Sequence, residues 1–137
     1  MAECVKVRQE ILEEMVAHAS REPHIECCGL LAGRDGVITE IFPATNSLSS
    51  PTAYEIAPRE LFEMFRTLRE RELTHLGQYH SHLSTENAPS PTDIEQAGYP
   101  DQAYFIVSLR PGAPNPVRAF SIRDGAVGEL EIILQKF

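Results

Sequence analysis

The chain has 137 residues, of which 42% are hydrophobic and 23% are charged, and its formal net charge is −8. This length fits one domain, residues 1–137, that is large enough to bury a core. The acidity argues against a nucleic-acid partner, because nucleic-acid surfaces draw on clustered lysines and arginines, and no apolar run approaches the roughly 20 residues that cross a membrane.

The N-terminal residues and the cysteines indicate the compartment. Residues 1–6 lack the basic region and the apolar stretch of a secretory signal, which predicts a cytoplasmic location. The three cysteines cannot all pair, and Cys27 and Cys28 are adjacent in an apolar segment. We therefore interpret them as buried reduced thiols rather than as a redox site.

The first predicted element is an amphipathic helix. Apolar residues recur at helical spacing from Val7 to about Ser20, and Pro23 marks the end of the pattern. His18 lies on this helix, and we expect it to be partly exposed.

A β-hairpin is predicted next. Two short apolar runs, 27–32 and 37–42, are separated by Gly33-Arg34-Asp35-Gly36, a composition typical of a tight turn between strands. The segment 43–51 is rich in Ser, Asn, Thr and Pro, which predicts a loop.

The second half combines two helix starts with further strands. Pro58 opens a second amphipathic helix, and Ser90 to Asp93 has the form of a helix N-terminus, with Ser at the cap and Pro at the first helical position. A central strand, 73–79, is expected to deliver His80 to its end. Three more strands are predicted at 103–109, 117–122 and 126–134. The order predicts an α/β single domain with a mixed central sheet flanked by helices.

The run Gly77-Gln78-Tyr79-His80-Ser81-His82 contains the principal candidate site. Two histidines at positions i and i+2 of an extended segment point to the same side, so His80 and His82 can converge on one ion. Asp93 can complete the set from the next element. Zinc takes imidazole nitrogens and carboxylate oxygens at about 2.0–2.2 Å, and a catalytic zinc needs only three protein ligands because water takes the fourth position. The sequence therefore predicts one zinc ion (Zn2+) per chain.

Two further residues are candidates for the reaction itself. A zinc hydrolase needs a base for the metal-bound water, whose pKa the ion lowers to about 7. Glu26 stands immediately before an apolar strand, and an ordinary carboxylate at a strand edge is an equal interpretation of its position. Ser90 either caps the helix that carries Asp93, or donates a hydrogen bond to a carbonyl oxygen as the carbonyl becomes tetrahedral.

Together these residues resemble the JAMM (MPN-plus) metalloprotease family. The shared pattern is His80-x-His82-x7-Ser90-x2-Asp93, with Glu26-x-Cys28-Gly29-Leu30-Leu31-x-Gly33 upstream. The resemblance covers nearly the whole chain. In detail the sequence is similar to the small single-domain prokaryotic members, through the runs Pro89–Asp93 and Tyr54–Pro58. It implies the JAMM/MPN fold, which is cytidine-deaminase-like.

The resemblance also implies a role for each site residue. His80, His82 and Asp93 would be zinc ligands, Glu26 the general base, and Ser90 the residue that steadies the tetrahedral intermediate. None of the five positions departs from the family pattern, which disfavours the inactive scaffold branch. The alternative function, a non-catalytic MPN-type module that binds partners, stays open at this point.

Members of this family cut the bond after the C-terminal glycine of ubiquitin or ubiquitin-like proteins. The implied partner is therefore a ubiquitin-like or sulfur-carrier protein with a C-terminal Gly-Gly. The motifs do not separate release of an amino acid from a sulfur carrier from cleavage of an isopeptide bond to lysine. Because a compact chain offers little surface for a second ubiquitin, we expect a small sulfur carrier, whose extended tail would add to an exposed strand edge.

Overall fold

The computed structural model of the chain describes residues 3–136. The strands and helices of this part of the chain are, in order, β1 (Cys4–Arg8), α1 (Gln9–Arg21), β2 (Cys28–Arg34), β3 (Val37–Ala44), α2 (Pro58–Glu70), β4 (Thr74–His82), α3 (Pro91–Gln96), β5 (Ala103–Ser108), β6 (Val117–Arg123) and β7 (Ala126–Gln135). The predicted central strand therefore extends to His82 and contains both histidines of the candidate site.

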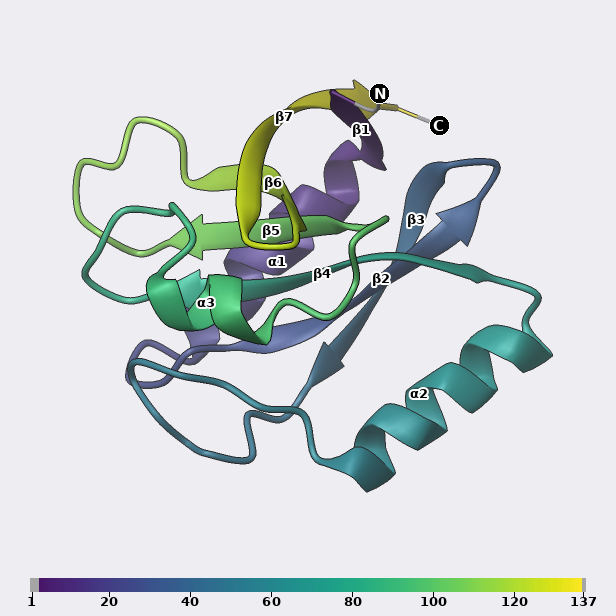
Figure 1. Ribbon diagram of the computed structural model, residues 1–137, viewed down its shortest axis with the longest axis horizontal. Helices are drawn as coiled ribbons and strands as arrows, with labels where there is room; N and C mark the ends of the chain where they lie inside the picture. Colours follow the sequence, from purple (N-terminus) through teal and green to yellow (C-terminus); the bar gives the residue numbers. More distant parts are fainter. Residues whose placement is uncertain (1–2, 137) are drawn as a thin grey trace.

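The strands form one mixed sheet in the order β1-β3-β2-β4-β5-β6-β7 (Figure 1). β2 runs antiparallel to β3 and to β4, whereas β4 runs parallel to β5. β1 pairs in parallel with both β3 and β7, so the sheet closes into a barrel. The mixed sheet was predicted and is confirmed, whereas its closure is a feature that the sequence analysis did not include.

The start of the chain differs from the prediction. Val7 belongs to β1 rather than to the first helix, which begins at Gln9. The side chain of Val7 is fully buried, and in the sheet this residue lies opposite Ile38 of β3 and Leu134 of β7. A five-residue strand that runs directly into a helix has no turn residue to mark it, so helical periodicity alone extended the helix too far.

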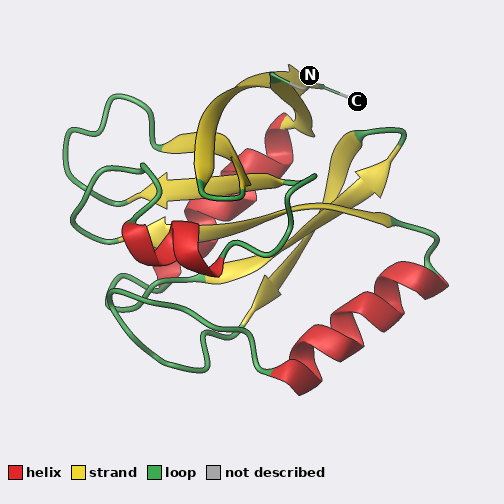
Figure 2. Ribbon diagram, viewed as in Figure 1, coloured by secondary structure: helices red, strands yellow, loops and turns green. Residues whose placement is uncertain are grey.

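Two long helices pack on opposite faces of the sheet (Figure 2). Neighbouring residues of a strand point to opposite faces. In β2, Leu31 contacts the core cluster that includes Met15 of α1, whereas Leu30 contacts the cluster that includes Met64 of α2. The predicted flanking helices are thus confirmed. Within residues 3–136, no helix is both long and apolar enough to cross a membrane.

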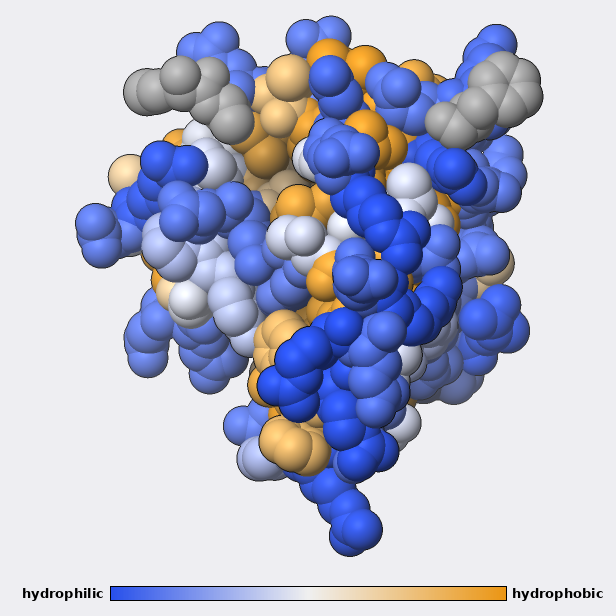
Figure 3. All heavy atoms as spheres, turned by 90° about the vertical axis from the view of Figure 1, so that its right-hand side faces the viewer, coloured by the Kyte–Doolittle hydropathy of each residue, from blue (hydrophilic) through white to orange (hydrophobic). Residues whose placement is uncertain are grey.

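The outer surface of α2 is polar. In Figure 3 the lower part of the face shown, where α2 lies, is mostly hydrophilic, with a few hydrophobic atoms between the charged side chains. Phe62 is one exposed apolar residue of this helix, with 62% of its surface accessible. The helix thus turns a solvated face outward, as its charge pattern predicted.

Close contact between β2 and β4 positions the candidate site. Cys28 lies opposite His80 in the antiparallel register, and Gly29 lies opposite Tyr79. A Cβ atom at Gly29 would come within 2.5 Å of the Tyr79 ring and 2.6 Å of the Phe42 carbonyl oxygen, so only glycine fits there. The Ser81 hydroxyl accepts a hydrogen bond from the Cys27 backbone N–H at 2.9 Å. These contacts fasten the start of β2 to the end of β4.

Candidate metal centre

Three side-chain atoms from β4 and α3 converge at one point. The Nε2 atoms of His80 and His82 are 3.2 Å apart, and each lies 3.1 Å from Oδ2 of Asp93. Both imidazoles are buried, with 2% and 5% of their residue surface exposed. Ligands held tetrahedrally at about 2.0–2.2 Å from one ion are roughly 3.3–3.6 Å apart, so the cluster is close to the geometry of a metal site.

The orientation of His82 is fixed by the loop that follows β4. Its Nδ1 lies 2.7 Å from the backbone carbonyl oxygen of Glu86. A carbonyl oxygen only accepts, so Nδ1 donates to it. With a metal ion bound, Nε2 of the neutral ring would present its lone pair to the ion, whereas without the ion a protonated Nε2 donates to Asp93. Such a hydrogen bond from the remote nitrogen is typical of metal-binding histidines.

A tyrosine covers His80. The rings of Tyr54 and His80 are stacked, with centroids 4.6 Å apart and an interplanar angle of 23°. Tyr54 comes from the segment between β3 and α2, which the sequence analysis expected to be partly a loop. Burial against this ring leaves His80 few alternative rotamers.

Asp93 is held by the start of α3. The Ser90 hydroxyl oxygen accepts a hydrogen bond from the Asp93 backbone N–H at 3.0 Å, and Asp93 Oδ2 accepts one from the Ser90 backbone N–H at 2.9 Å. This is a reciprocal capping box, with Pro91 at the first helical position. The capping interpretation of Ser90 is therefore confirmed. A hydroxyl that accepts one bond retains its own proton, so capping leaves Ser90 able to donate.

Among the three side chains of the cluster, the pKa values of His80 and Asp93 are lowered and that of His82 is raised. Burial lowers the pKa of His80, although its hydrogen bond to Asp93 opposes this effect. Burial acts in the same way on His82, but hydrogen bonds to Asp93 and to the Glu86 carbonyl prevail and raise its pKa. Burial acts to raise the pKa of Asp93, yet hydrogen bonds from His80 and His82 hold it well below its usual range. The carboxylate is thus kept charged, as a cation ligand must be.

Glu26 is a buried carboxylate beside this cluster. Only 5% of its surface is exposed, and its Oε1 has no hydrogen-bond partner among the described residues. Burial raises its pKa to about 7, with the nearby His82 opposing the shift and the Asp93 charge adding to it. A carboxyl group with a pKa near neutrality is suited to accept and release a proton. An ordinary strand-edge carboxylate would be exposed, so this environment favours the catalytic interpretation of Glu26.

Asn46, which the sequence analysis did not single out, supports the position of Glu26. Its Nδ2 donates to the carbonyl oxygens of Glu26 at 3.0 Å and Ala53 at 2.9 Å. Its Oδ1 accepts from the backbone N–H groups of Leu48 and Glu55. Asn46 thus ties the loop that carries Tyr54 to Glu26, two residues before the start of β2. The asparagine is 1% exposed, and its place in a polar loop gave no signal of that burial.

The other predictions for polar residues have mixed outcomes. His18, expected to be partly exposed, is 6% exposed, because the inner face of α1 packs on β4 and the His18 Nδ1 lies 2.6 Å from the Tyr79 hydroxyl. Cys27 and Cys28 are buried free thiols as predicted, whereas Cys4 is an exposed free thiol.

The residues fit a metal ion. One potential ligand atom from each of His80, His82 and Asp93 lies within 4.8 Å of the other two. Two neutral imidazole nitrogens and one carboxylate oxygen are donors that a divalent transition metal accepts. Three protein ligands with a position left for water are typical of catalytic rather than structural sites.

Comparison with known proteins gives consistent matches. The family model for prokaryotic homologs of the JAB domain matches residues 8–123. A CysO-cysteine peptidase of Mycobacterium tuberculosis is 38% identical over 125 residues, which are 90% of this chain and 86% of that protein. A desampylase of Haloferax volcanii is 34% identical over 104 residues, 74% of this chain and 75% of that protein. The solution structure of protein DSY2949 from Desulfitobacterium hafniense is 35% identical, has a TM-score of 0.85, and covers 97% of this chain and 94% of its own.

Proposed function

The chain belongs to the family of prokaryotic homologs of the JAB domain, and from this premise we propose that it is a zinc-dependent hydrolase of ubiquitin-like conjugates. It cleaves the amide or isopeptide bond after the C-terminal glycine of a ubiquitin-like or sulfur-carrier protein. The predicted JAMM-type membership and fold are confirmed. The two relatives named above are a peptidase and a desampylase, so the enzymatic function is favoured over a binding module.

One observation carries the proposal: a cluster of ligand atoms and an unpaired, proton-accepting carboxylate are buried side by side. His80, His82 and Asp93 converge to distances of 3.1–3.2 Å. Glu26 next to them has a raised pKa and an oxygen without a partner among residues 3–136. A scaffold module would need neither feature.

We assign zinc to the cluster, one ion per chain. Two imidazole nitrogens and a carboxylate oxygen form a ligand set that catalytic zinc commonly takes, with two histidines and one acidic residue. When bound, zinc would polarise the substrate carbonyl and lower the pKa of a coordinated water.

The roles of the chain's own residues follow from their surroundings. Glu26 would accept a proton from the attacking water and pass it to the leaving amine, because its carboxyl group exchanges protons near neutral pH. Ser90 would donate its hydroxyl proton to the carbonyl oxygen as charge develops there. His80, His82 and Asp93 would hold the ion and keep its position fixed.

We further propose that residues 1–137 form one catalytic domain. The family model ends at residue 123, but β7 lies beyond it and pairs with both β6 and β1. A cytoplasmic location is proposed as well, in keeping with three free cysteines.

The substrate class is taken from the relatives. One is a CysO-cysteine peptidase and the other a desampylase, and from these names and the family resemblance we infer that this chain acts on a bond made by a ubiquitin-like protein. We propose a small sulfur carrier as substrate, with its globular body giving affinity and its Gly-Gly tail entering beside the metal. A pocket lined by Gly29, Tyr54 and Gly98, among others, adjoins the Tyr54 ring that stacks on His80, and the tail would enter there.

The test compares three substrates with the zinc-loaded protein. They are a sulfur carrier that ends in Gly-Gly-amino acid, the same carrier with Ala-Ala in place of Gly-Gly, and lysine-linked diubiquitin. We expect efficient release of the amino acid from the first substrate only. Equal cleavage of the Ala-Ala form, or a preference for diubiquitin, would refute the substrate class.

A further inference from the structure

Three polar side chains are hydrogen-bonded to one another on the face of β4 that points away from the metal cluster. Tyr79 is 1% exposed, and its hydroxyl lies 2.6 Å from Nδ1 of His18 on α1. Nε2 of the same ring pairs with Oε2 of Glu22, one helical turn further along. We call these three residues the His18 network. It runs from the centre of the sheet to the surface, where the Glu22 side chain is 32% exposed.

The hydrogen bonds of the His18 network do not depend on one charge state. A carboxylate only accepts, so Nε2 of His18 carries the proton that is shared with Glu22. The Tyr79 hydroxyl then donates to Nδ1 of a neutral ring or accepts from a charged one. Among residues 3–136, none of the buried polar atoms of the network lacks a hydrogen-bond partner. The link between α1 and β4 is therefore present in both protonation states of the ring.

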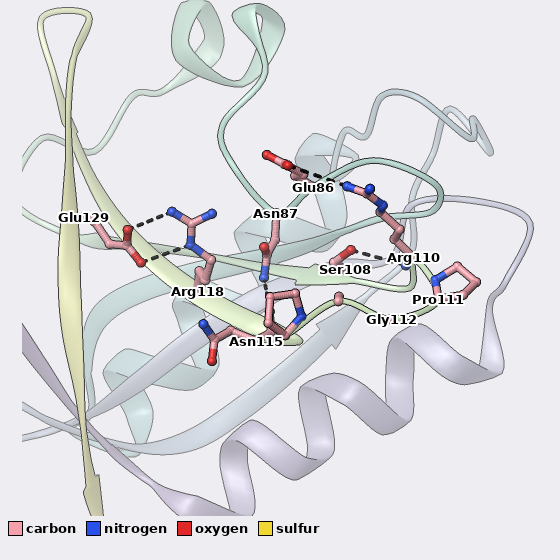
Figure 4. Close-up of a pocket in the computed structure, with 11 residues that line it drawn as sticks. Glu86, Asn87, Ser108, Arg110, Pro111, Gly112, Asn115, Arg118 and Glu129 are labelled. Atoms are coloured by element: carbon pink, nitrogen blue, oxygen red, sulfur yellow. Dashed lines mark hydrogen bonds and ion pairs between the residues drawn. The ribbon is translucent and has the colours of Figure 1, made fainter.

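Two ion pairs at the surface show how much the burial of the network matters. Figure 4 shows Arg118 with Glu129 and Arg110 with Glu86 around a pocket of about 430 Å3. Between 29% and 72% of each of these side chains is exposed, so the pairs contribute little to stability. The side chain of His18 is only 7% exposed, and water cannot replace a partner that it loses. Removing one member of the network should therefore change the structure around it.

The residues on either side of the ligand His80 both hold the segment that carries Glu26. Tyr79 and Ser81 precede and follow His80 in β4, so their side chains point to the α1 face of the sheet. The Ser81 hydroxyl accepts from the Cys27 backbone N–H at 2.9 Å, and the Ser81 N–H donates to the Cys27 carbonyl oxygen at 3.1 Å. Cys27 directly follows Glu26. One end of the Glu26 segment is thus fastened to β4.

The His18 network fastens the other end of the same segment. Its bond to Tyr79 holds the last turns of α1 against β4, and a short connection leads from the end of that helix to Glu26 (Figure 1). Asn46 and Ser50 also bond to the Glu26 backbone, but they belong to the loop after β3 and do not fix it to β4. The connection therefore runs between two anchors on β4 that flank a metal ligand.

We infer that the His18 network positions Glu26 relative to the metal ligands. His18 and Tyr79 are positioning residues, because they lie on the opposite face of the sheet and act through the segment that carries Glu26. The inference rests on the proposed function for its effect on turnover, since a general base must lie within hydrogen-bond reach of the attacking water. A displacement of about 1 Å can cost about 10²-fold in rate. Loss of the network should therefore lower kcat and leave zinc and substrate binding in place.

The kinetic test removes single members of the network. Tyr79→Phe deletes one hydroxyl, and we expect kcat to fall by about 10-fold with KM and the zinc content unchanged. His18→Gln should retain more kcat than His18→Leu, because its amide oxygen can accept from the Tyr79 hydroxyl. Ile122→Val, a cavity variant in β6 on a residue that is 3% exposed, should lose stability and keep kcat. An unchanged kcat in Tyr79→Phe, or a loss that appears in KM alone, would contradict the inference.

A double variant separates positioning from stability. Tyr79→Phe combined with His18→Leu replaces both partners of the buried hydrogen bond with apolar groups, so neither is left unsatisfied and the Tm should recover towards that of the parent. Glu22 is partly exposed and can turn into solvent. We expect kcat to stay low in the double variant, because the link between α1 and β4 is still missing. Recovery of kcat together with the Tm would show a structural contact only and would overturn the inference.

A measurement on the metal-free protein is independent of the proposed function. Hydrogen exchange at the Glu26 and Cys27 amides reports how firmly this segment is held, because their N–H groups donate to Ser50 and Ser81. We expect Tyr79→Phe to speed exchange at both amides by about 10-fold, with no change at Ile122 of β6. This result would support the inference even if the protein hydrolysed no ubiquitin-like conjugate. Unchanged exchange at the two amides, or an equal increase at Ile122, would overturn it.

Discussion

Asp93, whose side chain is 10% exposed, and Glu26, which is buried, are carboxylates at the same site, yet their surroundings shift their pKa values in opposite directions. Asp93 accepts hydrogen bonds from the Ser90 backbone and from two histidines, which keep its pKa far below the usual range. Glu26 has an oxygen without a partner among residues 3–136, and burial raises its pKa to about 7. The comparison shows that a carboxyl side chain stays ionised where hydrogen-bond donors surround it and carries a proton where burial leaves an oxygen without a donor.

The largest expected effect comes from removing the charged member of this pair. Asp93→Ala deletes one of three ligands, so the protein should retain no zinc after dialysis and hydrolysis should fall to background. Elemental analysis of the parent should give one zinc per chain. Asp101→Ala, which removes an exposed aspartate, should keep the metal. If Asp93→Ala bound zinc as well as the parent, the ligand assignment would be wrong.

The second effect comes from replacing the proton carrier. Glu26→Gln should keep the fold and one zinc per chain, because Glu26 is not among the ligand atoms. Turnover should fall by about 10²–10⁴-fold, since an amide cannot accept the proton of the attacking water. Glu63→Gln on the exposed face of α2 is the matched control. Turnover that is retained in Glu26→Gln would assign the base to another residue.

The third prediction concerns Ser90, which caps the helix that carries Asp93 and for which we propose a second role as donor to the substrate carbonyl oxygen. Ser90→Ala should bind zinc, lose about 10²–10³-fold in turnover as an oxyanion donor is removed, and lose about 1 kcal/mol of stability with the cap. Ser90→Thr should retain most of the turnover and most of the stability, because threonine keeps the hydroxyl group. Kinetics and thermal unfolding separate the two roles. A lower Tm with turnover intact would leave capping as the only role of Ser90.

The smallest effect is the pH dependence of stability in the metal-free protein. The pKa of Glu26 is higher in the folded state than its ordinary value of 4.5. Between pH 4.5 and 7 the folded state therefore keeps a proton on Glu26 that the unfolded state has lost. The stabilisation of the folded state by this proton is complete below pH 4.5 and is lost as the pH rises through about 7. Glutamine does not titrate, so the free energy of unfolding of Glu26→Gln, measured relative to that of the parent, should rise by up to about 3 kcal/mol between pH 4 and pH 8. Denaturant unfolding in the presence of a chelator measures this, and parallel curves for the two proteins would contradict it.

Local patterns made much of the site predictable. His80 and His82 are two residues apart on one strand, and the Ser90 to Asp93 run carries its own helix-start signal. Contacts between segments distant in sequence were not predictable in the same way. The stacking of Tyr54 on His80 and the hydrogen bonds of Asn46 depend on how the loop after β3 folds back. Spacing alone does not encode such contacts.

The same distinction applies to the fold. The hairpin of β2 and β3 was predicted because its turn, Asp35-Gly36 in the structure, lies within the predicted run Gly33 to Gly36, whose residues are next to each other in the chain. β1 was missed because its partners are β3 and β7 rather than its neighbours in the chain.

The pairing of the first strand with the last has a consequence for the order of folding. Cys4 lies opposite Glu131, so almost the entire described chain must be ordered or looped out before this contact forms. The entropy of closing such a long loop is recovered only when the intervening strands are in place, whereas β2 and β3 meet across a tight turn. We therefore expect the central strands, including β4 with His80 and His82, to assemble early, and the seam between β1 and β7 to close as a late step.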